Sequence, residues 1–248
     1  MTQPQPVESV FSRAWELLTR NWIIVVPGIV IGAIVGVLNE LLGPHVVYSA
    51  DGSVASVTGS FGSGILLGLI GTIAYIATVA YTTGMAGAAW QRGSTTLADG
   101  SAILQRDAAR IFLVAICLIV LGAVAAVLAI FTLGLAILAF FLFTLYVFPS
   151  AIVGDRGVAE SISESFRITL ARFVPTLILG ILIFVMRLLA GIIGGVLHII
   201  PFLGPIVGGI LVQIVISYVT LAIVGEYVNL RAAGAIPPAP ATPGGPTV

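Results

Sequence analysis

Arg187 is the residue whose charge and position most strongly suggest chemistry, because it lies well inside a long apolar stretch. Counted from Phe173, where that stretch begins, it lies about 21 Å along a helix. An ionisable side chain inside a membrane span is by default a hypothesis of function, here a contact for a lipid phosphate or another anion. The structural alternatives are a long side chain that extends to the outer headgroups, or an ion pair with Glu40, which reaches a similar depth.

A second group of polar residues closes the last apolar stretch and comprises Glu226, Tyr227 and Arg231. An acid at this position is able to pair with an arginine from a neighbouring surface helix, such as Arg172. We predict that these four residues form a structural clamp between a surface helix and the bundle. Proton transfer through Glu226 is the alternative.

The sequence contains no recognisable metal site or catalytic motif. His45 and His198 have no carboxylate or cysteine at ligand spacing, so no bound metal is expected. The single cysteine, Cys117, lies in an apolar run and is interpreted as a small core residue. The chain has no GxSxG elbow, no HExxH and, without any lysine, no GxxxxGK phosphate loop. We therefore expect no cofactor.

Composition places these residues in a membrane protein. Hydrophobic residues make up 59% of the chain and charged residues 8%, whereas a soluble domain has roughly 45–50% and 25%. The net charge is zero, so nothing indicates a nucleic-acid partner. The partners expected are membrane lipids and an unidentified membrane or cytoplasmic protein.

Apolar stretches of about 20 residues, the length that crosses a hydrocarbon core, occur six times. Amphipathic stretches with apolar residues at helical spacing precede the first, third and fifth of them. The predicted fold is an all-α integral membrane protein with three parallel hairpins, each preceded by a cytoplasmic amphipathic surface helix. The predicted spans are 22–42, 65–89, 111–131, 135–153, 173–198 and 205–228, and the surface helices are 7–21, 97–110 and 157–172.

Residues 7–232 form one predicted domain between two segments expected to be disordered, 1–6 and the Pro/Ala/Gly-rich 233–248. The loop 43–62 contains an Asp-Gly dipeptide between two β-favouring runs. It is therefore either a β-hairpin or a flexible loop.

Glycine recurs every four residues in the first span, at Gly28, Gly32 and Gly36. Such spacing leaves a smooth helix face that another helix can approach closely in lipid. We expect this face to pack against a helix of the same chain, with the seam of a homodimer as the alternative.

Nine of the ten arginines lie at one end of the predicted spans, here called the arginine-rich face. The positive-inside rule places this face, both termini and all three surface helices in the cytoplasm. All ten basic residues are arginine, which a GC-rich bacterial genome explains. The predicted location is the inner (plasma) membrane of a bacterium. The N-terminus lacks the pattern of a signal peptide, so the first span is expected to direct insertion.

Four short motifs along the chain carry a family resemblance. They are Phe11-Ser12-Arg13-Ala14-Trp15 through Asn21-Trp22, Gly84 to Arg92, Phe148-Pro149 through Gly157 to Ser165-Phe166-Arg167, and Tyr227-Val228-Asn229-Leu230-Arg231. Together they resemble a family of bacterial six-span membrane proteins grouped with the membrane domain of glycerophosphoryl diester phosphodiesterases. Glu164 and Asn229 depart from that family's pattern of a basic and an acidic residue. The resemblance implies the membrane domain alone, because the enzymes' chemistry belongs to a separate barrel for which this chain has no room.

Two classes of function follow. The first is a non-enzymatic integral membrane protein that organises lipid or docks a partner through its amphipathic helices. It is favoured by spans without polar rows and by the lack of a catalytic motif. The alternative is a transporter or channel for an amphipathic or lipid-like substrate, favoured by the pseudo-repeat and Arg187, although parallel repeats differ from the inverted pair of many transporters. A membrane-embedded hydrolase comes third.

Overall fold

The structure, a computed structural model, describes residues 4–42, 45–48, 54–58, 61–197 and 203–236. Most of this part of the chain is helical. The helices are α1 (Val7–Arg20), the short 3₁₀ helix η1 (Trp22–Val25), α2 (Val26–Leu42), α3 (Phe61–Arg92), α4 (Leu97–Phe131), α5 (Leu135–Thr144), α6 (Val147–Ile152), α7 (Val158–Ala171), α8 (Phe173–Leu197) and α9 (Leu203–Ala232). Of the two alternatives for the loop 43–62, the structure has the hairpin, in which β1 (His45–Tyr48) pairs with β2 (Val54–Thr58) in antiparallel fashion.

Long apolar helices account for the predicted membrane spans. Among the described residues, five candidate spans are long enough and apolar enough to cross a membrane. They are α3, α4, the consecutive helices α5 and α6 taken together, α8 and α9. α1 and the segment Trp22–Val35 meet at an angle of 92° and together count as a sixth. The prediction of a helical membrane protein is confirmed, whereas the grouping into three parallel hairpins stays a prediction.

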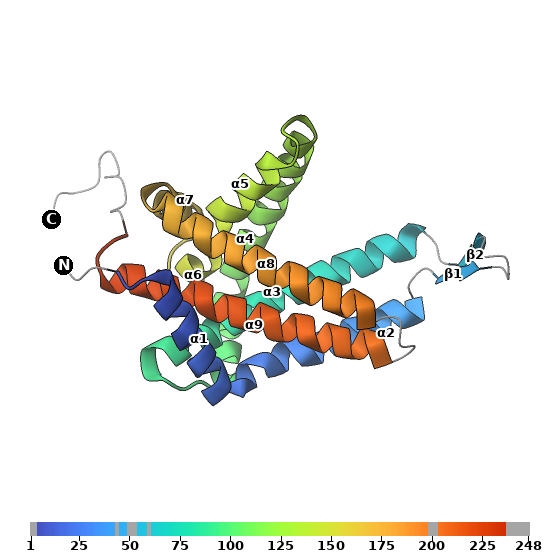
Figure 1. Ribbon diagram of the computed structural model, residues 1–248, viewed down its shortest axis with the longest axis horizontal. Coiled ribbons are helices and arrows are strands. Elements are labelled where there is room, and N and C mark those ends of the chain that lie inside the picture. Colours follow the sequence, from blue (N-terminus) through green and yellow to red (C-terminus); the bar gives the residue numbers. More distant parts are fainter. Residues whose placement is uncertain (1–3, 43–44, 49–53, 59–60, 198–202, 237–248) are drawn as a thin grey trace.

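α9 lies at the centre of the bundle. It contacts α2, α3 and α8 along its length and α1 near its end, and Figure 1 shows α3 and α9 running in the same direction. Side chains of α9 such as Leu221, Val224 and Leu230 are buried. The hairpin of α4 and α5 diverges from the bundle towards its tip (Figure 1), and α5 has no buried residue. The bundle around α9 is therefore the packed core of the molecule.

The predicted surface helix 97–110 is not a separate element, because α4 runs from Leu97 to Phe131 without a break. Its N-terminus has a capping box, in which Thr96 and Asp99 satisfy each other's backbone N–H groups. From Arg110 to Leu113 the sequence offers no proline, glycine or capping residue. The helical hydrogen bonds therefore continue into the span. This corrects the prediction of a surface helix lying apart from the third span.

The other two predicted surface helices do end at a break in the backbone. α1 ends before Asn21 (φ −124°, ψ 52°) and α7 before Arg172 (φ −131°, ψ 49°), so the two junction residues share one conformation. The first long helix after each junction, α2 or α8, carries a proline in its first turn, Pro27 or Pro175, where the missing N–H costs little. These junctions turn the chain from a surface helix into a span.

The fourth predicted span, 135–153, is broken into α5 and α6, which the sequence analysis did not foresee. Pro149 lacks the N–H group that would bond the carbonyl of Leu145 in an unbroken helix. Leu145 and Tyr146 form a turn at this point. The carbonyl of Leu145 is thereby left without its usual helical partner.

Hydroxyl groups of α7 satisfy the backbone at this break. Ser165 Oγ donates to the carbonyl of Phe143 at 2.7 Å and accepts the N–H of Tyr146 at 3.1 Å. Thr169 Oγ1 donates to the carbonyl of Leu142 at 3.1 Å. The buried face of α7 is therefore polar for a structural reason, because it supplies the bonds that the broken span lacks.

Gln5 and Asn229 join the beginning of the described chain to its end. The N–H of Gln5 donates to Oδ1 of Asn229 at 3.0 Å, and Nδ2 of Asn229 donates back to the carbonyl of Gln5 at 3.2 Å. Tyr218 of α9 also donates to the carbonyl of Phe11 in α1, at 3.1 Å. Within the segment 1–6, expected to be disordered, Gln5 thus has fixed partners, while residues 237–248 of the tail lie outside the described residues.

Candidate functional site

Arg187 lies on α8, and its hydrogen-bond partner is Tyr75 of α3. Nη2 of Arg187 donates to the Tyr75 hydroxyl at 2.8 Å, and the guanidinium carbon lies 5.7 Å from the centre of the ring. Within the described part of the chain, no carboxylate forms an ion pair with Arg187. The side chain of Glu40 lies outside the described residues, so the predicted ion pair stays a prediction.

Arg187 has hydrogen-bond donors to spare. A guanidinium group carries five N–H donors, and the bond to Tyr75 uses one. Arg187 is exposed on the bundle, as is Tyr75 with 43% of its surface. Within a membrane such exposure means contact with lipid. The pair therefore presents a cation with free, fork-shaped donors, the arrangement that binds carboxylate or phosphate oxygens.

The four residues of the predicted clamp lie at the same end of the molecule but have other partners. Glu226 is buried, and its Oε2 accepts a hydrogen bond from Asn229 at 3.1 Å. Among the described residues it forms no ion pair with Arg172. Tyr227 is also buried, whereas Arg231 is exposed and donates to the carbonyl of Val153 at 3.3 Å.

Glu164 of α7 contacts both α9 and the segment that precedes α7, and the sequence analysis assigned no role to it. The hydroxyl of Tyr227 donates to Glu164 Oε1 at 2.8 Å, and Arg156 Nε lies 3.2 Å from Glu164 Oε2. Glu164 is only 3% exposed, although charged residues of an amphipathic surface helix usually face solvent. Surface helix and bundle are therefore connected through Glu164 of α7 and Tyr227 of α9, and the predicted clamp of Glu226 with Arg172 stays a prediction.

The glycine face of α2 lies against Gln213 of α9. A Cβ atom on Gly28 would lie 2.8 Å from Gln213 Oε1, and one on Gly32 would lie 3.2 Å from Gln213 Cγ. Both glycines thus allow close contact between two helices of the same chain. The surroundings of Gly36 lie outside the described residues.

Contacts near the arginine-rich face show which sides of α3 and α9 meet. The indole N–H of Trp90 donates to the carbonyl of Leu221 at 2.9 Å. A Cβ atom on Gly225 would overlap the Trp90 ring. Residues four apart lie on the same side of a helix, so the interface continues towards the middle of the span. Thr82 lies eight positions before Trp90, and Ser217 and Gln213 lie four and eight positions before Leu221.

Polar side chains follow this interface into the span, a row that the sequence analysis missed. Thr82 lies on α3, and Gln213 and Ser217 lie on α9; Thr82 and Ser217 are buried. Thr82 Oγ1, Gln213 Oε1 and Ser217 Oγ have no hydrogen-bond partner in the described part of the chain. The residues were missed because they lie on two helices far apart in sequence, and only the pairing of α3 with α9 brings them to one interface.

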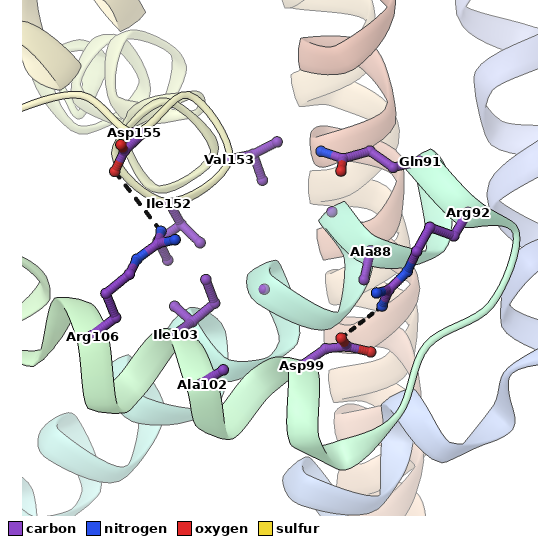
Figure 2. A pocket seen from close by; sticks show the side chains of 12 residues that line it. Ala88, Gln91, Arg92, Asp99, Ala102, Ile103, Arg106, Ile152, Val153 and Asp155 are labelled. Atoms are coloured by element: carbon purple, nitrogen blue, oxygen red, sulfur yellow. Dashed lines mark hydrogen bonds and ion pairs between the residues drawn. The ribbon is translucent and has the colours of Figure 1, made fainter.

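A cavity of about 360 Å³ lies near the arginine-rich face, where the end of α3, the start of α4 and the end of α6 meet (Figure 2). Two glycines bring these helices together, because a Cβ on Gly84 would lie 2.6 Å from Ile103 and one on Gly87 would lie 2.9 Å from Val153. Substituted side chains at these positions would push α4 and α6 away. The remaining lining residues are Ala88, Gln91, Arg92, Asp99, Ala102, Arg106, Ile152 and Asp155.

Arginine–aspartate pairs stand on two sides of this cavity (Figure 2). Arg92 Nη2 lies 2.6 Å from Asp99 Oδ1 on one side. On the other side, Arg106 Nη2 lies 3.8 Å from Asp155 Oδ1. Arg92 and Arg106 keep 57% and 59% of their side chains exposed. Both pairs are therefore accessible to a molecule in the cavity.

Asp155 has a second arginine partner behind the cavity. Arg110 Nη2 lies 2.8 Å from Asp155 Oδ1 and 2.6 Å from Asp107 Oδ1. The hydrogen bond and charge of Arg110 hold the pKa of the Asp155 carboxyl below its usual value. Asp155 also adopts a left-handed backbone conformation, with φ 54°, which aspartate and asparagine tolerate better than most residues. The carboxylate is thus ionised and fixed at the rim.

The histidines and the cysteine do not form a common site in the described part of the chain. His45 lies in β1, the position of His198 is outside the described residues, and Cys117 is half-buried on α4. No three His, Cys, Asp or Glu side chains among the described residues are placed to hold a metal ion.

The apolar helices that carry these sites define a polytopic helical membrane protein. A family model described as a domain of unknown function, DUF7847, matches residues 6–233, and the chain belongs to this family. No curated protein and no solved structure matches the chain. The likeness to the membrane domain of the phosphodiesterases stays a resemblance.

Proposed function

We propose that this protein is a non-enzymatic lipid-organising protein of the bacterial plasma membrane, which holds the phosphate of a lipid, or a similar anion, at Arg187. The observation that carries the proposal is the pairing of Arg187 with a neutral phenol, Tyr75, and with no described carboxylate. An arginine at membrane depth is costly unless it is paired or reaches the headgroups. A lipid phosphate supplies the negative charge that Tyr75 lacks.

The depth of the pair supports this proposal. Arg187 lies about 21 Å along α8 from Phe173, and Tyr75 lies about 26 Å along α3 from Arg92. Both distances start at the arginine-rich face and end in the far half of a hydrocarbon core about 30 Å thick. With the arginine-rich face in the cytoplasm, Arg187 extends towards the phosphates of the outer leaflet.

Tryptophans of the first surface helix support a second contact with lipid at the opposite face. Trp15 on α1 and Trp22 at the junction after it are 57% and 69% exposed. Indole rings favour the boundary between headgroups and acyl chains. α1 buries Val10, Ala14 and Leu17 within the protein while these tryptophans face outward, as in a helix lying in the interface.

Native mass spectrometry of the detergent-released protein tests the role of Arg187. We expect the wild type to retain an anionic lipid and Arg187→Leu to lose it without losing its thermal stability, because removal of a poorly paired charge is well tolerated. Tyr75→Phe should weaken retention less, since it keeps the ring. Arg20→Leu is the matched control, because Arg20 is exposed and pairs with Glu16 outside the spans. A wild type without bound lipid, or equal retention in Arg187→Leu, would refute the proposal.

The polar row between α3 and α9 supports the alternative function, a transporter or channel for an amphipathic or lipid-like substrate. Water that reaches Thr82, Gln213 and Ser217 would satisfy their oxygens. Ser217→Cys in a Cys117→Ala background should then react with a membrane-impermeant thiol reagent. Ala222→Cys, buried on the same helix, is the control. Equal protection of both cysteines would rule out a wet path at this position.

A further inference from the structure

We propose that the cavity between α3, α4 and α6 binds a zwitterionic group composed of a phosphate and a primary ammonium. This is the chemistry of an ethanolamine phospholipid headgroup and of soluble phosphoethanolamine. The cavity lies at the arginine-rich face, its α3 residues lie about 14–26 Å from Tyr75 along that helix, and Arg187 is not among its lining residues. The inference therefore goes beyond the proposed role of Arg187.

The size of the cavity suits a headgroup. Its volume of about 360 Å³ falls at the lower end of the range, roughly 300–1,000 Å³, that small-molecule sites occupy. Ala88, Ala102, Ile103 and Val153 contribute apolar surface to the lining, beside the charged side chains. The space therefore suits a compact polar group that also has an apolar part.

The charges around the cavity balance, which favours a zwitterion over a net anion or cation. The arginines are Arg92, Arg106 and Arg110, and each has an aspartate partner among Asp99, Asp107 and Asp155. A net charge in the cavity would be attracted by one member of each pair and repelled by the other. A molecule with both charges satisfies both members.

Each half of the ligand has partners within the lining. Arg92 on one side and Arg106 on the other offer guanidinium donors to a phosphate. Asp99 and Asp155 offer carboxylate acceptors to the three N–H donors of a primary ammonium. The lining contains no aromatic residue, so it lacks the cage that recognises quaternary ammonium groups such as choline. The geometry thus favours ethanolamine over choline.

Lipid selection by the full chain tests the inference. The protein is placed in nanodiscs of equal parts phosphatidylethanolamine and phosphatidylcholine with identical acyl chains, and retained lipid is counted by native mass spectrometry after release. We expect the wild type to prefer phosphatidylethanolamine by about tenfold, the gain expected of one charge-assisted hydrogen bond. The preference should fall towards one in Arg92→Gln and in Asp155→Asn.

Two controls keep the result specific. Asp155→Asn removes the charge while keeping a residue that tolerates φ 54°. Arg20→Gln removes one member of an exposed ion pair on α1 that is not part of the lining, and should leave the preference unchanged. Arg187→Leu should also leave it unchanged, so failure of the proposed function and failure of this inference are distinguishable.

A second measurement separates the two sources of the ligand. Soluble phosphoethanolamine is titrated calorimetrically into nanodiscs of phosphatidylcholine alone. Lipid selection without binding of the soluble compound assigns the site to a membrane lipid, and binding of the soluble compound that is lost in Arg92→Gln assigns it to a soluble ligand. No preference and no binding in the wild type, or unchanged values in Arg92→Gln and Asp155→Asn, would overturn the inference.

Discussion

The junctions at Asn21 and Arg172 have almost the same backbone dihedral angles but are stabilised in different ways. At the first, the side chain of the junction residue makes the bonds. Asn21 Nδ2 donates to the carbonyls of Leu17 at 3.0 Å and Gly93 at 3.2 Å, and Oδ1 accepts the N–H of Thr95 at 3.1 Å. Asn21 therefore closes α1 and fixes the α3–α4 loop at once.

At the second junction, the helix before the turn makes the bonds. Arg172 Nε has no hydrogen-bond partner in the described chain. Ser165 and Thr169 of α7 instead bond the broken fourth span, and Glu164 bonds Tyr227 of α9. The same turn thus arises from a capping side chain in one place and from a polar helix face in the other. Residues 110–113 of α4 contain neither a capping side chain nor a proline, and the helix continues there without a break.

A proline in α4 tests most strongly whether this third helix differs from the two junctions. Leu113→Pro removes a helical hydrogen bond in the helix interior and should cost about 3 kcal/mol or more. Leu113 is 51% exposed, so the loss of its side chain adds little. Leu97→Pro, at the first position of α4, is the control and should cost far less. Thermal unfolding in detergent would measure both, and a tolerated Leu113→Pro would mean that the chain does bend near Ile111.

Replacement of Asn21 should have the next largest effect. Asn21→Ala removes three hydrogen bonds at a site only 8% exposed, and should lower the free energy of unfolding by about 2–3 kcal/mol. Arg172→Ala, at the equivalent position, should lower it by less than about 1 kcal/mol. Chemical denaturation of the two variants measures the difference, and equal losses would show that both junctions depend on the residue at the turn.

The hydroxyls of α7 should have a smaller but definite effect. Ser165→Ala removes both bonds across the break in the fourth span and should cost about 1–2 kcal/mol, and Thr169→Val should cost about 1 kcal/mol. Ser163→Ala is the control, because Ser163 is exposed on the same helix. If Ser165→Ala were as stable as Ser163→Ala in thermal unfolding, the break would not depend on α7.

The weakest effect expected is a dependence on pH at the segment leading into α7. Arg110 lowers the pKa of Asp155 from its ordinary 3.8, so the carboxylate stabilises the fold above the unfolded pKa. This contribution is lost as the pH falls through the lower, folded pKa. Wild type and Asp155→Asn should therefore differ in melting temperature by a constant amount above about pH 5 and converge below about pH 4. A difference that persists at about pH 2 would contradict this.

Much of the fold could be predicted because length and periodicity are local signals. The amphipathic patterns predicted surface helices 7–21 and 157–172, and the structure has α1 and α7 within a residue or two of these bounds. The same pattern over 97–110 could not show that α4 continues, since continuity depends on the lack of a capping side chain. Pro149 is a signal for a break within residues 135–153, but nothing in that stretch reveals that hydroxyls of α7 bond the backbone there.

The candidate sites were harder to predict because their partners are distant in sequence. Arg187 could be identified as an isolated charge, but Tyr75 lies 112 residues away and carries no charge to mark it. The role of Glu164 could not be predicted, because periodicity does not distinguish a polar face in water from one that bonds buried groups. The cavity combines residues of three helices, which only the folded chain brings together.

The bond between Gln5 and Asn229 has a consequence for biogenesis. Gln5 and Phe11 leave the ribosome before their partners on α9, which are made 224 and 207 residues later. At about 5–20 residues per second, α1 waits for roughly 10–40 s before its docking site is complete. During that interval α1 lacks the part of its docking site that α9 supplies, although α3 residues such as Trp90 are already made. Docking of α1 is thus a closing step of assembly, available only to a chain synthesised through α9.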